Sequence, residues 1–178
     1  VLSAKNKTGS VVHVSDAATE QQLRSETLGD YRVLYFATHG LLPGELKCQA
    51  EPALVLTPPS SPVSRANDGL LEASEIASLR LNADLVVLSA CNTAGSAGKF
   101  GGDALSGLAE SFFYAGARSL VVSHWQVSSK ATAELMSGMF EALGPDLTGG
   151  AARSLQTSQL KLIKQENTAH PLFWAAFV

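Results

Sequence analysis

His39 and Cys91 are the residues whose types and settings point to covalent chemistry. Each comes shortly after an apolar, strand-like run, at 33–37 and at 85–88 respectively. Cysteine attacks a carbonyl carbon as its thiolate, and an imidazole can take the thiol proton or stabilise the anion. Acyl transfer also needs N–H donors for the developing oxyanion, and the backbones of Gly40 and Cys91 are candidates. The pair predicts a cysteine nucleophile with a histidine base, against the alternative that Cys91 is a buried packing residue.

A third apolar run, at 119–123, is followed by His124 and Trp125. Ligands of open parallel sheets bind outside the carboxyl ends of the strands, so all three polar clusters are expected at one rim. His124 is therefore a second candidate base for Cys91. A zinc site made of His39, Cys91 and His124 is a further alternative, but these residues lack zinc-finger spacing. The glycine-rich stretch at 95–102 lacks the Gly-Lys-Ser/Thr ending of a phosphate loop, which argues against a nucleotide site.

The elements that must position these residues alternate between strands and helices. Strands are predicted at 11–14, 31–37, 85–88, 119–123 and 173–178. Helices are predicted after the capping residues Thr19 and Asp103, at 72–79, and along apolar stripes from Ala131 and from Ala152. The segment 41–68, rich in proline, serine and glycine, is predicted to be a loop with an apolar run at 53–56. Buried strands alternating with helices indicate an α/β fold, a mostly parallel sheet with helices on both faces.

Composition narrows the class of protein. The chain has 178 residues, 46% hydrophobic and 16% charged, which suits one folded domain over 1–178. A formal net charge of -3, with scattered basic residues, predicts no nucleic-acid partner, and no apolar stretch is long enough for a membrane span. Cys48 and Cys91 lie in different settings and are interpreted as reduced thiols of a cytoplasmic protein. The abrupt chain ends suggest a domain excised from a longer polypeptide.

Five stretches together carry a family resemblance: YFATHG at 35–40, GLL at 69–71, ADLVVLSACNT at 83–93, AGARS at 115–119 and HPLFWAAFV at 170–178. In this order they resemble the CHAT domain, a caspase-like cysteine peptidase module related to caspases and separase. Caspases also carry their histidine about 50 residues before the cysteine, although the caspase signature around the cysteine is absent here. Aspartate specificity is therefore not implied.

The resemblance implies a caspase-like fold and assigns roles to matching residues. It makes His39 the catalytic histidine, Cys91 the nucleophile and Gly40 the oxyanion glycine. It places Trp125 in the substrate groove, whereas His124 stands where the family has an apolar residue. Many family members carry helical repeats on the N-terminal side, and such repeats are expected in the parent chain.

The leading hypothesis is a cysteine endopeptidase that cleaves a protein substrate through a thioester acyl-enzyme and needs no cofactor or metal. A caspase-like scaffold that binds a partner without cutting it is the alternative, and a small-molecule thiol hydrolase is a third. Trp125, His124 and Asp103 are candidate substrate-binding residues, although Asp103 also fits the role of a helix cap. A regulatory domain or activator protein is the expected partner besides the substrate.

Overall fold

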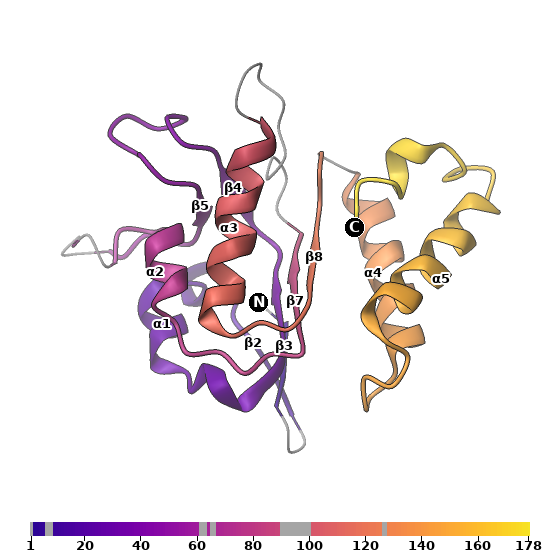
Figure 1. Cartoon of the computed structure of the whole chain (residues 1–178), viewed down its shortest axis with the longest axis horizontal. Helices are drawn as coiled ribbons and strands as arrows, with labels where there is room; N and C mark the ends of the chain where they lie inside the picture. The colour runs from indigo at the N-terminus through magenta and orange to yellow at the C-terminus, as the bar shows by residue number, and fades with distance from the viewer. Residues whose placement is uncertain (1, 6–8, 61–63, 65–66, 90–100, 126–127) are drawn as a thin grey trace.

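A five-stranded sheet forms the centre of the molecule, with strands in the order β2-β1-β3-β7-β8 (Figure 1). The structure is a computed structural model, and it describes residues 2–5, 9–60, 64, 67–89, 101–125 and 128–178, with the backbone alone at 2–5 and 101–106. The strands are β1 (Leu2–Lys5), β2 (Ser10–Val12), β3 (Tyr31–Phe36), β7 (Leu85–Leu88) and β8 (Leu120–Val122). Strand β7 runs parallel to both β3 and β8, whereas β1 pairs antiparallel with β2 and with β3. The predicted α/β class is confirmed. The strand predicted at 11–14 is present as β2, two residues shorter at its end, and β1 is an antiparallel strand that was not predicted.

Strands β3 and β7 are buried, as their apolar sequences predict. Every residue of β7 is buried, and in β3 only Arg32 is partly accessible. Phe36 is paired with Leu88, and Leu88 is paired with Val122, so these residues form one row across the three parallel strands. This row is the last one before the carboxyl edge of the sheet, where the candidate residues are expected.

Helices cover both faces of the sheet (Figure 1). The helices are α1 (Glu20–Ser25), α2 (Ala73–Ala77) and α3 (Gly101–Ala115) on one face, and α4 (Ser129–Leu143) and α5 (Ala151–Ile163) on the other. Phe112 of α3 packs in the same core cluster as Phe36, at a ring-centroid distance of 5.5 Å. Leu135 of α4 belongs to a second cluster with Val87. Along β7, Val86 and Leu88 belong to the first cluster and Leu85 and Val87 to the second. Alternate residues of one strand therefore contribute to two cores, as in a doubly covered sheet.

A second, antiparallel sheet forms around the segment 41–68, which was predicted to be a loop. It contains β4 (His39–Leu41), β5 (Ala53–Val55) and β6 (Leu70–Glu72), in the order β4-β5-β6. The prediction of a loop across 41–68 was therefore wrong at 53–55, where part of the apolar run 53–56 forms β5. Strands of three residues are too short to show alternation, and only pairing with distant residues stabilises them.

The C-terminal segment is less regular than the strand predicted at 173–178. A 3-10 turn, η3 (Pro171–Phe173), comes first, and two further short turns lie earlier, η1 (Ser15–Ala17) and η2 (Leu28–Asp30). Only the last residues pair with β8 and the residues after it. The backbone N–H of Val122 donates to the Val178 carbonyl (3.0 Å), and that of His124 donates to the Ala176 carbonyl (2.8 Å). The segment thus covers the outer edge of β8 while leaving the preceding turn beside the carboxyl edge of the sheet.

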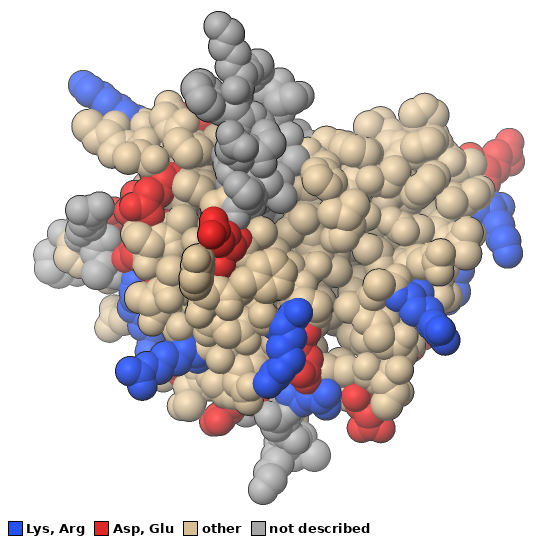
Figure 2. All heavy atoms as spheres, in the orientation of Figure 1, with Lys and Arg blue, Asp and Glu red and all other residues tan. Residues whose placement is uncertain are grey.

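Charged side chains do not gather into a region of one sign on the face drawn in Figure 2, as far as the described residues show. The Lys and Arg side chains there are interspersed with Asp and Glu. None of the helices in the described ranges combines the length and the apolar character that crossing a bilayer requires.

Candidate active site

His39 lies where the chain passes from the main sheet into the small one. Strand β3 ends at Phe36, and β4 begins at His39, so two residues separate the sheets. The backbone of His39 is paired with Val55 of β5, and the hydroxyl of Thr38 donates a hydrogen bond to the Val55 carbonyl. The imidazole is exposed. The fold therefore fixes the backbone of His39 while leaving its side chain accessible to a ligand.

The parallel register relates His39 to the other candidate positions. Phe36, Leu88 and Val122 share a row, and His39, Cys91 and Trp125 are the third residues after them. The Ser89 N–H donates to the Phe36 carbonyl at 2.9 Å, which continues the ladder one residue beyond β7. Cys91 itself lies outside the described residues.

Gly40 is buried in β4, directly after His39, and is paired with Leu54. It thus lies next to the exposed imidazole, in the region where the sequence predicted an oxyanion donor. Its assignment as that donor stays a prediction.

His124 and Trp125 follow β8 and are both fixed to the C-terminal segment. The backbone N–H of His124 donates to Ala176, and its side chain is half-buried. The indole Nε1 of Trp125 donates to the Leu172 carbonyl at 3.1 Å, and the Trp125 side chain remains 36% exposed. Leu172 is itself 50% exposed. Trp125 and Leu172 thus present accessible apolar surface at the carboxyl edge of the main sheet, next to β8. His39 follows β3 at the same edge, and β7 lies between β3 and β8.

Asp103 lies inside α3, which begins at Gly101, so the prediction that Asp103 caps this helix was wrong. The start of the helix was misplaced because glycine has a low helix propensity, and Gly101 and Gly102 were therefore assigned to the preceding loop. The side chain of Asp103 is outside the described part of the chain, and its role in binding substrate stays untested.

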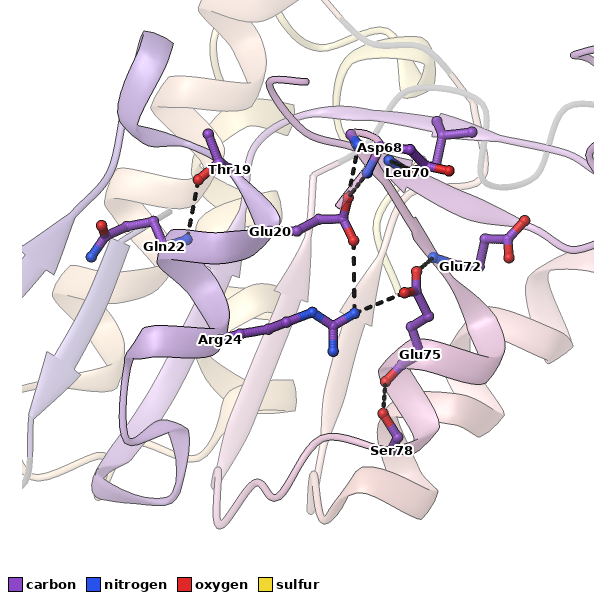
Figure 3. Close-up of polar contacts among 10 residues, drawn as sticks. Thr19, Glu20, Gln22, Arg24, Asp68, Leu70, Glu72, Glu75 and Ser78 are labelled. Carbon is purple, nitrogen blue, oxygen red and sulfur yellow. Dashed lines mark hydrogen bonds and ion pairs between the residues drawn. The ribbon is translucent and has the colours of Figure 1, made fainter. Parts of the chain in front are cut away.

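A buried ion-pair network, missed by sequence reasoning, stabilises the small sheet (Figure 3). The Glu20 side chain is 0% exposed, and its Oε2 accepts the backbone N–H groups of Asp68 (2.8 Å) and Gly69 (2.7 Å). Its Oε1 lies 3.7 Å from the Arg24 guanidinium, which donates to Glu75 at 2.8 Å. Gly69 in turn accepts a hydrogen bond from Leu56, at the end of β5. Glu20 therefore connects α1 to the sheet that carries His39.

Gly69 explains part of the GLL motif. Its φ is +91°, and a Cβ atom at this position would lie 2.9 Å from the Cα of Pro58. A side chain would both strain the backbone and collide with the neighbouring segment. Glycine is thus required where Glu20 holds the start of β6.

Glu75 has a perturbed acidity within this network. Burial raises the pKa of its carboxyl above the ordinary value, and the nearby Glu20 and Asp68 carboxylates add to the rise. The hydrogen bond from the Glu72 N–H and the charge of Arg24 act in the opposite direction on the pKa and are smaller in sum. The network is therefore a source of pH-dependent stability.

The two remaining histidines and the second cysteine have other surroundings. The Nε2 of His13 lies 3.2 Å from the Glu26 carboxylate, and the Nδ1 of His170 accepts the N–H of Leu172 within the C-terminal turn. Cys48 is free and exposed. Among the described residues, no three His, Cys, Asp or Glu side chains are grouped closely enough to hold a metal ion.

The sequence was compared with curated proteins and with models of protein families. None of the curated proteins compared with this chain matches it. The family model of the CHAT domain matches residues 1–178, the whole of the sequence. The fold, with helices on both faces of a sheet whose centre is parallel, agrees with the caspase-like architecture that this family implies. The chain belongs to the CHAT domain family.

Proposed function

We propose that the chain is a cysteine endopeptidase in which Cys91 is the nucleophile and His39 the base. The observation that carries this proposal is the row formed by Phe36 and Leu88, because His39 and Cys91 follow these residues at the same interval. Adjacent parallel strands that end together bring equally spaced residues to neighbouring positions at the rim of a sheet. Membership of a caspase-like family supports the same pair.

The proposed reaction uses only groups of this chain, the peptide and water. Imidazole takes the proton of the Cys91 thiol, and the thiolate sulfur attacks the scissile carbonyl carbon. When the C–N bond breaks, the imidazolium of His39 protonates the departing amine and a thioester remains. His39 then takes a proton from water, whose oxygen attacks the thioester carbon. The C–S bond breaks, the imidazolium returns its proton to the Cys91 sulfur, and the acid product loses its proton to solvent as a carboxylate.

The backbone N–H groups of Gly40 and Cys91 are the proposed donors to the oxyanion. Trp125 and His124 are proposed to contact the peptide on the β8 side of the site, supported by the exposure of the indole. Asp103 is a weaker candidate for the same role. The proposed partners are a protein substrate and a regulatory domain or activator, and the free thiol of Cys48 fits a reducing compartment such as the cytosol.

The test is incubation of the chain with a library of unstructured peptides, followed by mass spectrometry of the new termini. Wild-type protein and Cys48→Ser are expected to give the same products, because Cys48 lies in a surface loop. Cys91→Ser is expected to give none. A library left intact by wild-type protein, yet bound by it, would favour the scaffold alternative. Identical products from wild type and Cys91→Ser would overturn the proposal.

A further inference from the structure

A pocket of about 440 Å³ lies beside the backbone of His39 and has no role in the mechanism above. The described residues that line it come from the end of β2 and the turn after it (12–15), the end of β3 (35–38), Ala18 and the end of β5 (55–57). It is thus located at the carboxyl edge of the main sheet, on the opposite side of β3 from β7. Pockets of this volume are typical of small-ligand or side-chain binding sites.

Two residues connect this pocket directly to His39. Thr38 and Val55 both line it. Thr38 precedes His39 in the chain, Val55 is paired with His39 across the small sheet, and the two are joined by the Thr38 hydroxyl. A side chain held in the pocket would therefore lie next to the segment that positions the imidazole.

The lining determines which side chains the pocket could accept. None of its described residues is Lys, Arg, Asp or Glu. The hydroxyls of Thr38 and Thr57 already donate to the carbonyls of Val55 and Ser15, and His13 is paired with Glu26. A charged side chain would lose its hydration here without gaining an opposite charge, which is costly. Apolar surface makes up somewhat more than half of the wall, and the aliphatic side chains of Val12 and Val14 are 47% and 64% exposed there.

The geometry points to this pocket as the specificity pocket of the peptidase, taking a neutral, mainly apolar side chain of the substrate peptide. The inference rests on the proposed function and adds the class of substrate to it. It also gives a physical reason against aspartate specificity, because an aspartate would find no basic partner among the described lining residues.

Val14→Asp tests the pocket without removing a buried group, since Val14 is 64% exposed. The matched control is Leu160→Asp, which adds the same charge at a 49% exposed apolar position of α5, away from the pocket. Peptide substrates would carry Leu, Phe, Lys or Glu at one varied position at a time. Wild type is expected to prefer Leu and Phe at one position by roughly tenfold or more in kcat/KM. Val14→Asp should reduce that preference and favour Lys, whereas Leu160→Asp should match wild type.

Binding to a Cys91→Ser background separates this inference from the proposed function. The probes are N-acetyl-phenylalanine amide and N-acetyl-lysine amide, followed by ligand-observed NMR. The phenylalanine probe is expected to bind, and Val14→Asp to weaken it more than Leu160→Asp does. If Val14→Asp cleaves peptides with the same preference as wild type, the assignment of the specificity pocket is overturned, whereas the proposed peptidase activity is retained. Binding that depends on Val14, with no cleavage by wild type, overturns the peptidase and with it the pocket's role in substrate selection.

Discussion

Phe36 and Leu88 are paired in register across the parallel strands β3 and β7, and the Ser89 N–H bonds to the Phe36 carbonyl beyond the end of β7. This pairing sets the relation between the two segments that follow. From Phe36 the chain passes into β4 at His39, and from Leu88 it continues toward Cys91. A shift of register by one residue would reverse the faces of all side chains in one strand and mix the two cores. The same packing that fixes the strands thus also fixes the start of both candidate segments.

The thiol of Cys91 is expected to react faster than that of Cys48, because an adjacent imidazole raises the fraction of thiolate. Cys48 is exposed, so a slower reaction there cannot be ascribed to burial. The measurement is the initial rate of alkylation by iodoacetamide at neutral pH, with peptide mapping. His39→Ala should slow labelling of Cys91 and leave Cys48, the internal control, unchanged. Equal rates at both cysteines in the wild-type protein would contradict the expectation.

His39→Ala is expected to lower kcat/KM by about 10² or more, since it removes the proposed general base. Because the His39 side chain is exposed, the substitution should leave the fold intact, and the loss of activity should not come from unfolding. A thermal melt of wild type and His39→Ala checks this. His124→Ala should alter the preference among peptides with a smaller loss of rate. The backbone bond of His124 to Ala176 does not involve the imidazole, so this variant keeps the edge of β8. The opposite ranking of the two variants would make His124 the base.

The sequence predicted those elements well that carry a local signal, such as an apolar stripe, a capping residue or an uninterrupted apolar run. The apolar stripe of α4 agrees with its buried residues, which are Ala131, Leu135, Met136, Met139 and Leu143. Thr19 was predicted as a cap, and its side chain accepts the N–H of Gln22 at 3.1 Å. The strands β3 and β7 are likewise within a residue of their predicted limits. The signal that predicts such elements lies in residues close in sequence, even where, as in β3 and β7, the pairing is distant.

The features that the sequence did not predict depend on residues far apart in it. Strand β5 is defined by pairing with β4 and β6, and no local pattern of three residues could assign it. Glu20 lies in the first turn of α1, where acidic side chains are common, so its sequence position does not signal burial. Its burial follows from contact with Asp68 and Gly69, 48 and 49 positions away. The pocket beside Thr38 likewise requires β2, β3 and β5 to meet.

Glu20→Ala is expected to destabilise the chain by about 2–4 kcal/mol, because two backbone N–H groups lose a charged acceptor. Glu141→Ala is the matched control, since Glu141 also pairs with a basic residue, Lys161, but is 76% exposed. The control should change the free energy of unfolding by no more than roughly 0.5 kcal/mol. Urea denaturation measures both variants. Equal losses would show that the bonds from Asp68 and Gly69 contribute nothing beyond an ordinary surface pair.

Glu75→Gln tests the pH dependence that the buried network predicts. The pKa of Glu75 is raised from its ordinary value of 4.5, mainly by burial. At pH values between the pKa of Glu75 in the unfolded chain and its higher pKa in the folded chain, the folded chain binds more protons at this site than the unfolded chain. The contribution of Glu75 to the free energy of unfolding therefore decreases as the pH rises. Glutamine cannot ionise, yet it preserves the acceptor of the capping box at the start of α2.

The measurement is the free energy of unfolding from urea titrations at several pH values between about 4.5 and 7.5. As the pH rises, wild type is expected to lose stability relative to Glu75→Gln, with the change complete once Glu75 is fully ionised in the folded chain. Glu141→Gln, at an exposed ion pair, should follow wild type throughout. If wild type instead gains stability relative to Glu75→Gln, the attraction of Arg24 outweighs burial, and the pKa of Glu75 is lowered in the fold.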